Sequence, residues 1–222
     1  MAMTLSLGRW QLARAAQKEA VEAAMAARAG LPPLSGAELT ALARPQEVLY
    51  QRVQLRGRWL AQHTVFLDNR QMDARQGLYV LTPLALDGSS AVLLVQRGWV
   101  ARNFLERGAV PSIDTPAGLV SIEGRMAPPP GKLYELGTAS TGLIRQNLDI
   151  GEFARESGLA LLPVSVQQAG AASDGLLRNW PRVAAGVDKH YGYAFQWFGL
   201  SALIAVLYVW FQIVRPFQQR RR

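Results

Sequence analysis

His190 is followed by aromatic side chains at helical spacing, which is a pattern that fits a haem site. Tyr193 and Trp197 come three and seven residues later, so in a helix they share a face with the imidazole. A neutral imidazole is an axial ligand of haem iron, and an aromatic face packs well against a macrocycle. Alternatively, His190 is an interfacial residue beside lipid headgroups, and the aromatics are membrane-belt anchors. Residue chemistry alone favours the second interpretation.

A second polar cluster, Asp68, Asn69 and Arg70, lies at the end of a predicted strand. Asp and Asn bond their own backbone in turns, and an arginine beside them is expected to form an ion pair. This turn is the simpler interpretation, and a site for a partner is the alternative.

A third cluster, Arg97, Gly98 and Trp99, lies late in another predicted strand. Gly98 predicts a bulge or a close backbone approach, and Trp99 is expected in the core. Arg97 interrupts an apolar strand, so it needs an anionic partner: Asp68, a neighbouring acid or a ligand carboxylate. A partner within the protein is the favoured alternative.

The rest of the sequence offers little catalytic chemistry. The chain has no cysteine and only two histidines, which excludes disulfides, thiolate metal sites and covalent c-type haem attachment. It contains no P-loop, no nucleophile elbow, no HExxH and no dinucleotide fingerprint, and its acids are scattered. We therefore expect a protein that is not an enzyme and has no catalytic residues. Trp180 is a further candidate for a side chain that packs against the cofactor.

Residues 191–214 contain no acid, base or histidine. As a helix they extend about 36 Å, enough to cross a hydrocarbon core of about 30 Å. Half of the net charge of +8 comes from the arginines that follow, Arg215 and Arg220 to Arg222. We expect this tail to stay cytoplasmic beside anionic lipid. The rest of the sequence has no stripe of basic residues, so we do not expect nucleic-acid binding.

The remaining chain divides into an N-terminal helix, a linker and a β-rich domain. Residues 1–30 are predicted to be helical and to be the remnant of a first transmembrane helix. Residues 31–46 are predicted to be a linker with a small helix capped by Ser35. Residues 47–182 contain six or seven short strands and one helix that follows Asp149, and residues 215–222 are the basic tail. The predicted class is α+β, with an antiparallel barrel-like or sandwich-like domain outside the cytoplasm.

The chain resembles the surfeit locus protein 1 family of cytochrome c oxidase assembly factors. The resemblance is carried by segments in shared order: residues 8–14 (GRWQLAR), 67–70 (LDNR), 77–84 (GLYVLTPL), 94–100 (LVQRGWV) and 190–198 (HYGYAFQWF). Two features depart from the family pattern. The first span is largely missing before Gly8, and Gln96 stands where Asn is usual.

The resemblance implies two spanning helices around the β-rich domain and a role in maturing the largest oxidase subunit. It also implies binding of haem a, with His190 as the iron ligand. In the hypothesis built on it, Tyr193, Trp197 and Trp180 are the packing walls. The implied partners are that subunit, other oxidase biogenesis factors and membrane lipid. The implied place is the bacterial inner membrane, with the mitochondrial inner membrane as the alternative. A cofactor-free scaffold that holds nascent oxidase subunits stays open as a second function.

Overall fold

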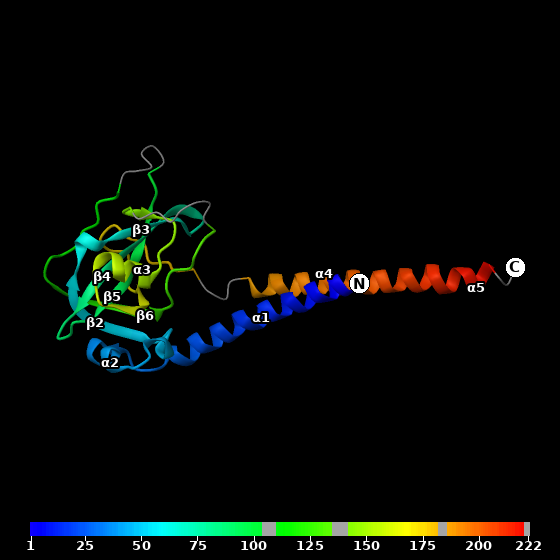
Figure 1. Cartoon of the computed structure of the whole chain (residues 1–222), viewed down its shortest axis with the longest axis horizontal. Helices are drawn as coiled ribbons and strands as arrows, with labels where there is room; N and C mark the ends of the chain where they lie inside the picture. The colour runs from blue at the N-terminus through cyan, green and yellow to red at the C-terminus, as the bar shows by residue number, and fades with distance from the viewer. Residues whose placement is uncertain (104–109, 135–141, 182–185, 220–222) are drawn as a thin grey trace. The chain divides into compact units, whose positions relative to one another are not determined.

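The computed structural model describes residues 1–103, 110–134, 142–181 and 186–219 of the chain. It divides the chain into two compact units. One unit consists of Met1–Ala24 and Arg182–Arg222, and the other is Met25–Pro181. Figure 1 shows the elements of both units along the chain.

The unit Met25–Pro181 is built around one sheet, which has eight strands among the described residues. The strands are β1 Leu34–Ser35, β2 Arg52–Trp59, β3 Val65–Met72, β4 Arg75–Leu86, β5 Val92–Ala101, β6 Leu119–Ala127, β7 Ile144–Arg145 and β8 Leu161–Gln168. They are ordered β1-β2-β6-β8-β5-β4-β3-β7, and β2 also pairs with β4. The pairings among β2, β6, β8, β5 and β4 therefore form a closed cycle.

Strand β2 shows how the polar and apolar pattern sets the faces of the sheet. Its residues alternate strictly between exposed and buried, with Val53, Leu55 and Trp59 turned into the core. Side chains of successive residues in a strand point to opposite faces, so the charged residues between them are solvent-exposed. The alternation in the sequence is the direct cause of this arrangement.

Strand β5 has both faces covered, which explains its nearly continuous apolar sequence. Leu93 and Val95 pack in one hydrophobic cluster, with Leu84 and Val166. Leu94 points the other way, into a second cluster that contains Phe153 of helix α3 (Ile150–Ser157). β5 runs between β4 and β8, pairing antiparallel with the first and parallel with the second.

Two predicted helix caps are confirmed. Ser35 and Glu38 form a capping box at the start of α2 (Gly36–Ala41), within the segment predicted as a linker. Asp149 accepts hydrogen bonds from the first turn of α3, and Gly158 ends that helix in the left-handed conformation. Short 3-10 helices, Pro45–Val48 and Ala61–His63, flank β2.

The turn between β4 and β5 and the irregularity at Pro163 also follow local rules of the sequence. Gly88 has a φ of 72° in the turn between β4 and β5, where Leu86 donates to the carbonyl of Ala91. Pro163 lies in β8 where its pairing with β5 changes register. Of the two alternatives for a proline in a strand, an edge or a bulge, the structure has the irregular register.

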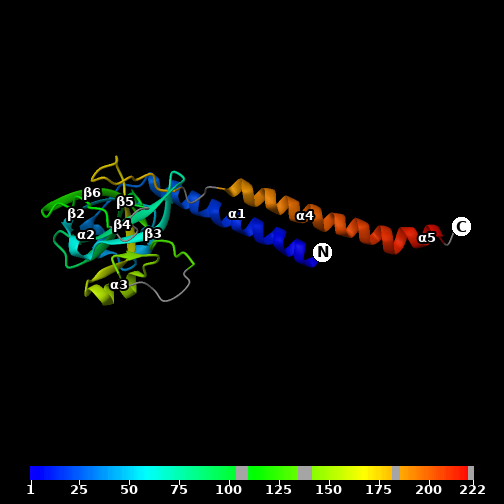
Figure 2. The ribbon, with the colours of Figure 1, turned by 90° about the horizontal axis from the view of Figure 1, so that it is seen from above.

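The other unit contains helix α1 (Ala2–Ala29, of which residues 2–24 belong here) and helix α4 (Val187–Val209). α4 continues into a π-helical turn, Trp210–Val214, and then α5 (Arg215–Gln219). Figures 1 and 2 both show α1 and α4 side by side. Residues Val187–Ile213 form one helix long and apolar enough to cross a membrane, with mean hydropathy 1.7, and this fits membrane anchoring.

The α+β class with a large sheet is therefore confirmed. The barrel-like or sandwich-like shape, the membrane orientation of the sheet unit and the first spanning helix stay predictions. In the part of the chain that the structure describes, Val187–Ile213 is the one helix long and apolar enough to cross a membrane, and α1 is not such a helix.

Candidate functional site

His190 lies in the first turn of α4, where its imidazole meets α1. Its Nδ1 is 2.7 Å from Oε1 of Gln11, and the imidazole is half-buried. In this orientation Gln11 presents its amide oxygen, which accepts a hydrogen bond from the histidine tautomer that carries its proton on Nδ1. The lone pair of the neutral ring is then on Nε2, which is the form in which histidine binds a metal.

Small side chains let α1 and α4 approach each other beside this histidine. Ala15 and Ala194 are buried in the pair. A Cβ on Gly8 would lie 2.7 Å from the ring of Phe198, so a larger residue would displace that ring. Near the other end of the pair, the hydroxyl of Thr4 lies 2.5 Å from that of Ser201. Small and hydroxyl side chains are typical of helix pairs that pack in membranes.

The aromatic residues predicted to surround a cofactor differ in exposure. Tyr193 is 52% exposed, whereas Trp197 is half-buried. Both lie on the same helix as His190. Their apolar surface is available for a flat ligand or for lipid, which are the two alternatives raised by the sequence.

Trp180 belongs to the sheet unit. Its indole nitrogen donates to the carbonyl of Gln168 at 2.8 Å, and its ring packs edge-on against Tyr79 at 5.2 Å. Trp180 therefore packs within the sheet unit and lines one of its surface concavities.

Asp68, Asn69 and Arg70 form a bulge in β3 rather than a terminal turn. The pairing with β4 shifts between Leu67 and Arg70, and Asn69 has a φ of 56° while its N–H donates to Asp68 at 2.7 Å. Asp68 pairs with Arg102, a partner the sequence did not reveal.

Within the described part of the chain, Arg70 has no acidic partner at ion-pair distance and donates to two backbone carbonyls, of Gly131 and Gln146, both at 2.8 Å. Its guanidinium also lies over the ring of Tyr79. Burial lowers the pKa of Arg70, while Tyr79 and Asp68 oppose the shift. The residue joins two loops to the sheet.

Arg97 is 1% exposed and has the partner within the protein that its position required. Its guanidinium lies 3.4 Å from Asp174, 2.6 Å from the Thr115 hydroxyl and 2.7 Å from the Asp114 carbonyl. It also lies over the ring of Trp59, at 4.7 Å. Burial lowers its pKa, and the Asp174 carboxylate opposes that shift.

Gly98 and Trp99 also match their predictions. The register of β4 and β5 shifts beside Gly98, and a Cβ there would lie 2.8 Å from Leu176 and from the Leu177 carbonyl. Trp99 is 1% exposed, and its indole nitrogen donates to the carbonyl of Arg70 at 2.9 Å. Arg70, Arg97 and Trp99 are therefore buried in internal contacts, whereas Asn69 of the first motif is exposed.

Gln11 is the candidate functional residue that the sequence analysis missed. Thr4, Gly8, Gln11 and Ala15 are spaced four, three and four residues apart, which places them on one helical face. This spacing is the signal in the sequence that could have identified Gln11. Among the described residues, no cluster of three or more His, Cys, Asp or Glu could hold a metal ion.

Comparisons with known proteins cover nearly the whole chain. The model of the SURF1 family matches residues 1–202. A SURF1-like protein of Rickettsia bellii is 27% identical over 209 residues, covering 91% of this chain and 83% of the relative. A SURF1-like protein of Rickettsia conorii is 26% identical over 212 residues, covering 92% and 85%. These proteins are similar to the chain in sequence along almost its full length.

Proposed function

Because the chain belongs to the SURF1 family, which is generally linked to cytochrome c oxidase assembly, we propose that it is a membrane-anchored assembly factor. In this proposal it binds haem a through His190 and assists insertion of the haem into the largest oxidase subunit. The observation that carries the proposal is the hydrogen bond between His190 Nδ1 and Gln11 Oε1, because it directs the other ring nitrogen to a ligand.

The residues around His190 suit a haem as far as the donor set is concerned. A single proximal imidazole is sufficient to hold haem iron, and one imidazole is what the helix pair offers. Bound haem would supply the redox-active iron that the oxidase needs. The chain's own residues hold and shield it: Gln11 fixes the ring, and Tyr193 and Trp197 offer apolar surface.

The proposed action is capture and hand-over without catalysis. The sequence has no recognisable catalytic motif, and the buried motif residues Arg97 and Trp99 are occupied by internal contacts. The proposed partners are the largest oxidase subunit, other biogenesis factors and membrane lipid, without nucleic acid. The apolar helix Val187–Ile213 and the basic tail after it support an inner-membrane location, with the sheet unit periplasmic and the C-terminus cytoplasmic.

The test is to produce the full chain together with haem a synthesis, purify it in mild detergent and record its absorption spectrum. We expect haem bands in the wild type, lost or shifted in His190→Ala. His63→Ala is the matched control, because His63 is the other histidine of the chain and lies in the sheet unit. It should keep the wild-type spectrum.

Full haem binding with an unchanged spectrum in His190→Ala would refute the ligand assignment. If that variant lost haem but still supported oxidase maturation, the cofactor-free scaffold would be favoured instead. The burial of Arg97 and Trp99 bears on that alternative, since replacing either would act through the fold and not through a lost contact surface.

A further inference from the structure

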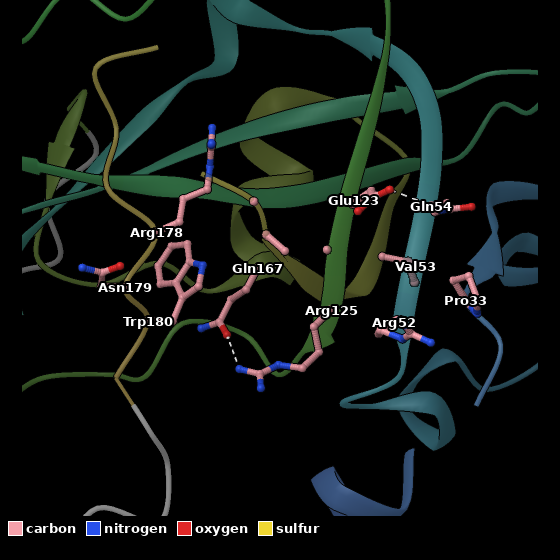
Figure 3. Close-up of a pocket in the computed structure, with 13 residues that line it drawn as sticks. Pro33, Arg52, Val53, Gln54, Glu123, Arg125, Gln167, Arg178, Asn179 and Trp180 are labelled. Atoms are coloured by element: carbon pink, nitrogen blue, oxygen red, sulfur yellow. Dashed lines mark hydrogen bonds between the residues drawn. The ribbon is translucent and has the colours of Figure 1, made fainter. Parts of the chain in front are cut away.

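A concave surface of about 490 Å³ lies on the sheet unit, and the proposed function does not use it (Figure 3). Its floor includes outward-facing side chains of β2 and β6, namely Arg52, Gln54, Glu123 and Arg125. Gln167 of β8 and Trp180 contribute the adjoining wall. Concavities of this volume are typical of small-molecule sites.

Two arginines occupy directly opposite positions in the floor of this concavity, and the guanidinium of Arg125 is turned toward Gln167 (Figure 3). Arg52 of β2 is the direct cross-strand partner of Arg125 in β6, and the next pair on the same face is Gln54 with Glu123. Like charges in directly opposite positions destabilise a sheet unless something neutralises them. The second pair is satisfied by a hydrogen bond of 3.3 Å, but the first is not.

Neither arginine has an acidic partner among the described residues. Arg125 donates to Oε1 of Gln167 at 3.0 Å, and Arg52 reaches the carbonyl of Leu31 at 3.5 Å. These contacts use one guanidinium nitrogen of each and leave the others free for a ligand. Burial lowers the pKa of Arg125, and Tyr50 opposes the shift, but a guanidinium stays charged. A half-buried cation beside a second cation favours an anion.

Trp180 gives the concavity a rigid aromatic wall. Its indole nitrogen is held by Gln168 and its edge by Tyr79, so the ring has little freedom to move. Figure 3 shows Trp180 and Arg125 on either side of Gln167. A ligand that reaches the arginines would therefore extend along an aromatic surface.

We propose that this concavity binds a small molecule in which a carboxylate is joined to a planar apolar body. The carboxylate bridges Arg52 and Arg125, and the planar body lies against Trp180. A guanidinium fork matches a carboxylate with two parallel hydrogen bonds. A carboxylate carries less charge than a phosphate, so Glu123 repels it less. The proposal is independent of haem binding at His190.

The test uses the full chain in detergent micelles, titrated with 2-naphthoate in a calorimeter at low salt. We expect saturable binding that weakens at least tenfold in Arg125→Gln and in Arg52→Gln. Arg155→Gln is the matched control, because Arg155 is an exposed arginine of α3 outside the concavity, and it should bind as the wild type does. Neutral 2-naphthylmethanol should not bind saturably to this surface.

The Arg52→Gln variant keeps the test valid if the half-buried Arg125 proves necessary for folding, because Arg52 is exposed. Absence of saturable 2-naphthoate binding to the wild type would overturn the proposal. Equal affinity in the wild type and Arg52→Gln would also overturn it. Tighter binding of inorganic phosphate than of 2-naphthoate would refute the assignment to a planar carboxylate.

Discussion

The indole nitrogen of Trp99 donates a hydrogen bond of 2.9 Å to the backbone carbonyl of Arg70. This bond joins two motifs that lie 29 residues apart in the sequence. It crosses from β5 to the bulge of β3, over the intervening strand β4. The tryptophan thus supplies a donor to the Arg70 carbonyl, directly after the bulge. Each motif therefore needs the other to keep its geometry.

Replacing Trp99 by phenylalanine should lower the free energy of unfolding of the sheet unit by about 1–3 kcal/mol, because a buried carbonyl loses its donor. Trp99→Ala should cost about 3–5 kcal/mol, because it also leaves a cavity. Urea unfolding of the detergent-solubilised chain measures both. Trp10→Phe, at a position that is 53% exposed, should leave the midpoint unchanged. Equal stability of wild type and Trp99→Phe would contradict the bracing role.

Arg97→Met should destabilise the sheet unit by about 1–3 kcal/mol, because buried hydrogen bonds to a charged group are lost. The change removes one arginine that pairs with Asp174 and leaves another, Arg178. It also takes the guanidinium donor from Thr115 and from the Asp114 carbonyl. Arg56→Met is the control, because Arg56 pairs with Asp87 on the surface, where an ion pair contributes less than about 1 kcal/mol. Thermal melts followed by circular dichroism compare the two variants. Similar melting temperatures for both would show that the buried network is not needed for stability.

Local rules predicted much of this fold. The alternation in β2, the caps at Ser35 and Asp149, and the turn at Gly88 each depend on neighbours within a few residues. Because these signals involve only neighbouring residues, they can be recognised directly in the sequence. The burial of Arg97 and its need for an internal anion followed from desolvation, although the identity of Asp174 did not.

What the sequence could not predict is set by contacts far along the chain. Asp68 with Arg102 and Gln11 with His190 join elements whose meeting depends on the whole fold. The bulge in β3 was predicted as a turn because Asp and Asn favour both, and only the register with β4 distinguishes them. Trp180 was predicted to be a wall of the cofactor site, and its contacts with Tyr79 and Gln168 in the sheet unit were not predicted.

Acid should weaken the attachment of α3 through Glu156. Its carboxylate accepts hydrogen bonds from Arg145 at 2.6 and 2.7 Å, which lower its pKa below the ordinary value of 4.5. A depressed pKa adds stability above pH 4.5, and this is lost as the pH falls through the lowered value. Because Glu156 is 42% exposed, solvent screening limits the effect to below about 1 kcal/mol.

The expected result for Glu156→Gln is a lower unfolding free energy than wild type at pH 7, with the difference shrinking as the pH falls below 4.5. Urea titrations at a series of pH values measure it. Glu22→Gln, at an exposed position of α1, should change neither the stability nor its pH dependence. A difference that grows in acid would mean that the pair does not act through this carboxylate.

Gln11 should control how His190 binds haem. Its amide oxygen accepts the Nδ1 proton at 2.7 Å, and leucine at the same position keeps much of the volume but has no acceptor. Loss of such a supporting hydrogen bond typically lowers metal affinity about 10- to 100-fold, so Gln11→Leu should retain correspondingly less haem after dilution. Gln11→Glu should retain haem, because a carboxylate oxygen also accepts from Nδ1.

A role in packing alone would give a different result, so the test needs a readout specific to the imidazole. The iron–histidine stretching band in resonance Raman spectra reports the electron donation that the Nδ1 hydrogen bond strengthens. We expect the band to fall in frequency in Gln11→Leu. It should be unchanged in Gln17→Leu, because Gln17 is an exposed residue of α1 six positions after Gln11. If Gln11→Leu kept both the affinity and the band, the imidazole would be oriented by its own helix, and the α1 contact would serve only to hold the two helices together.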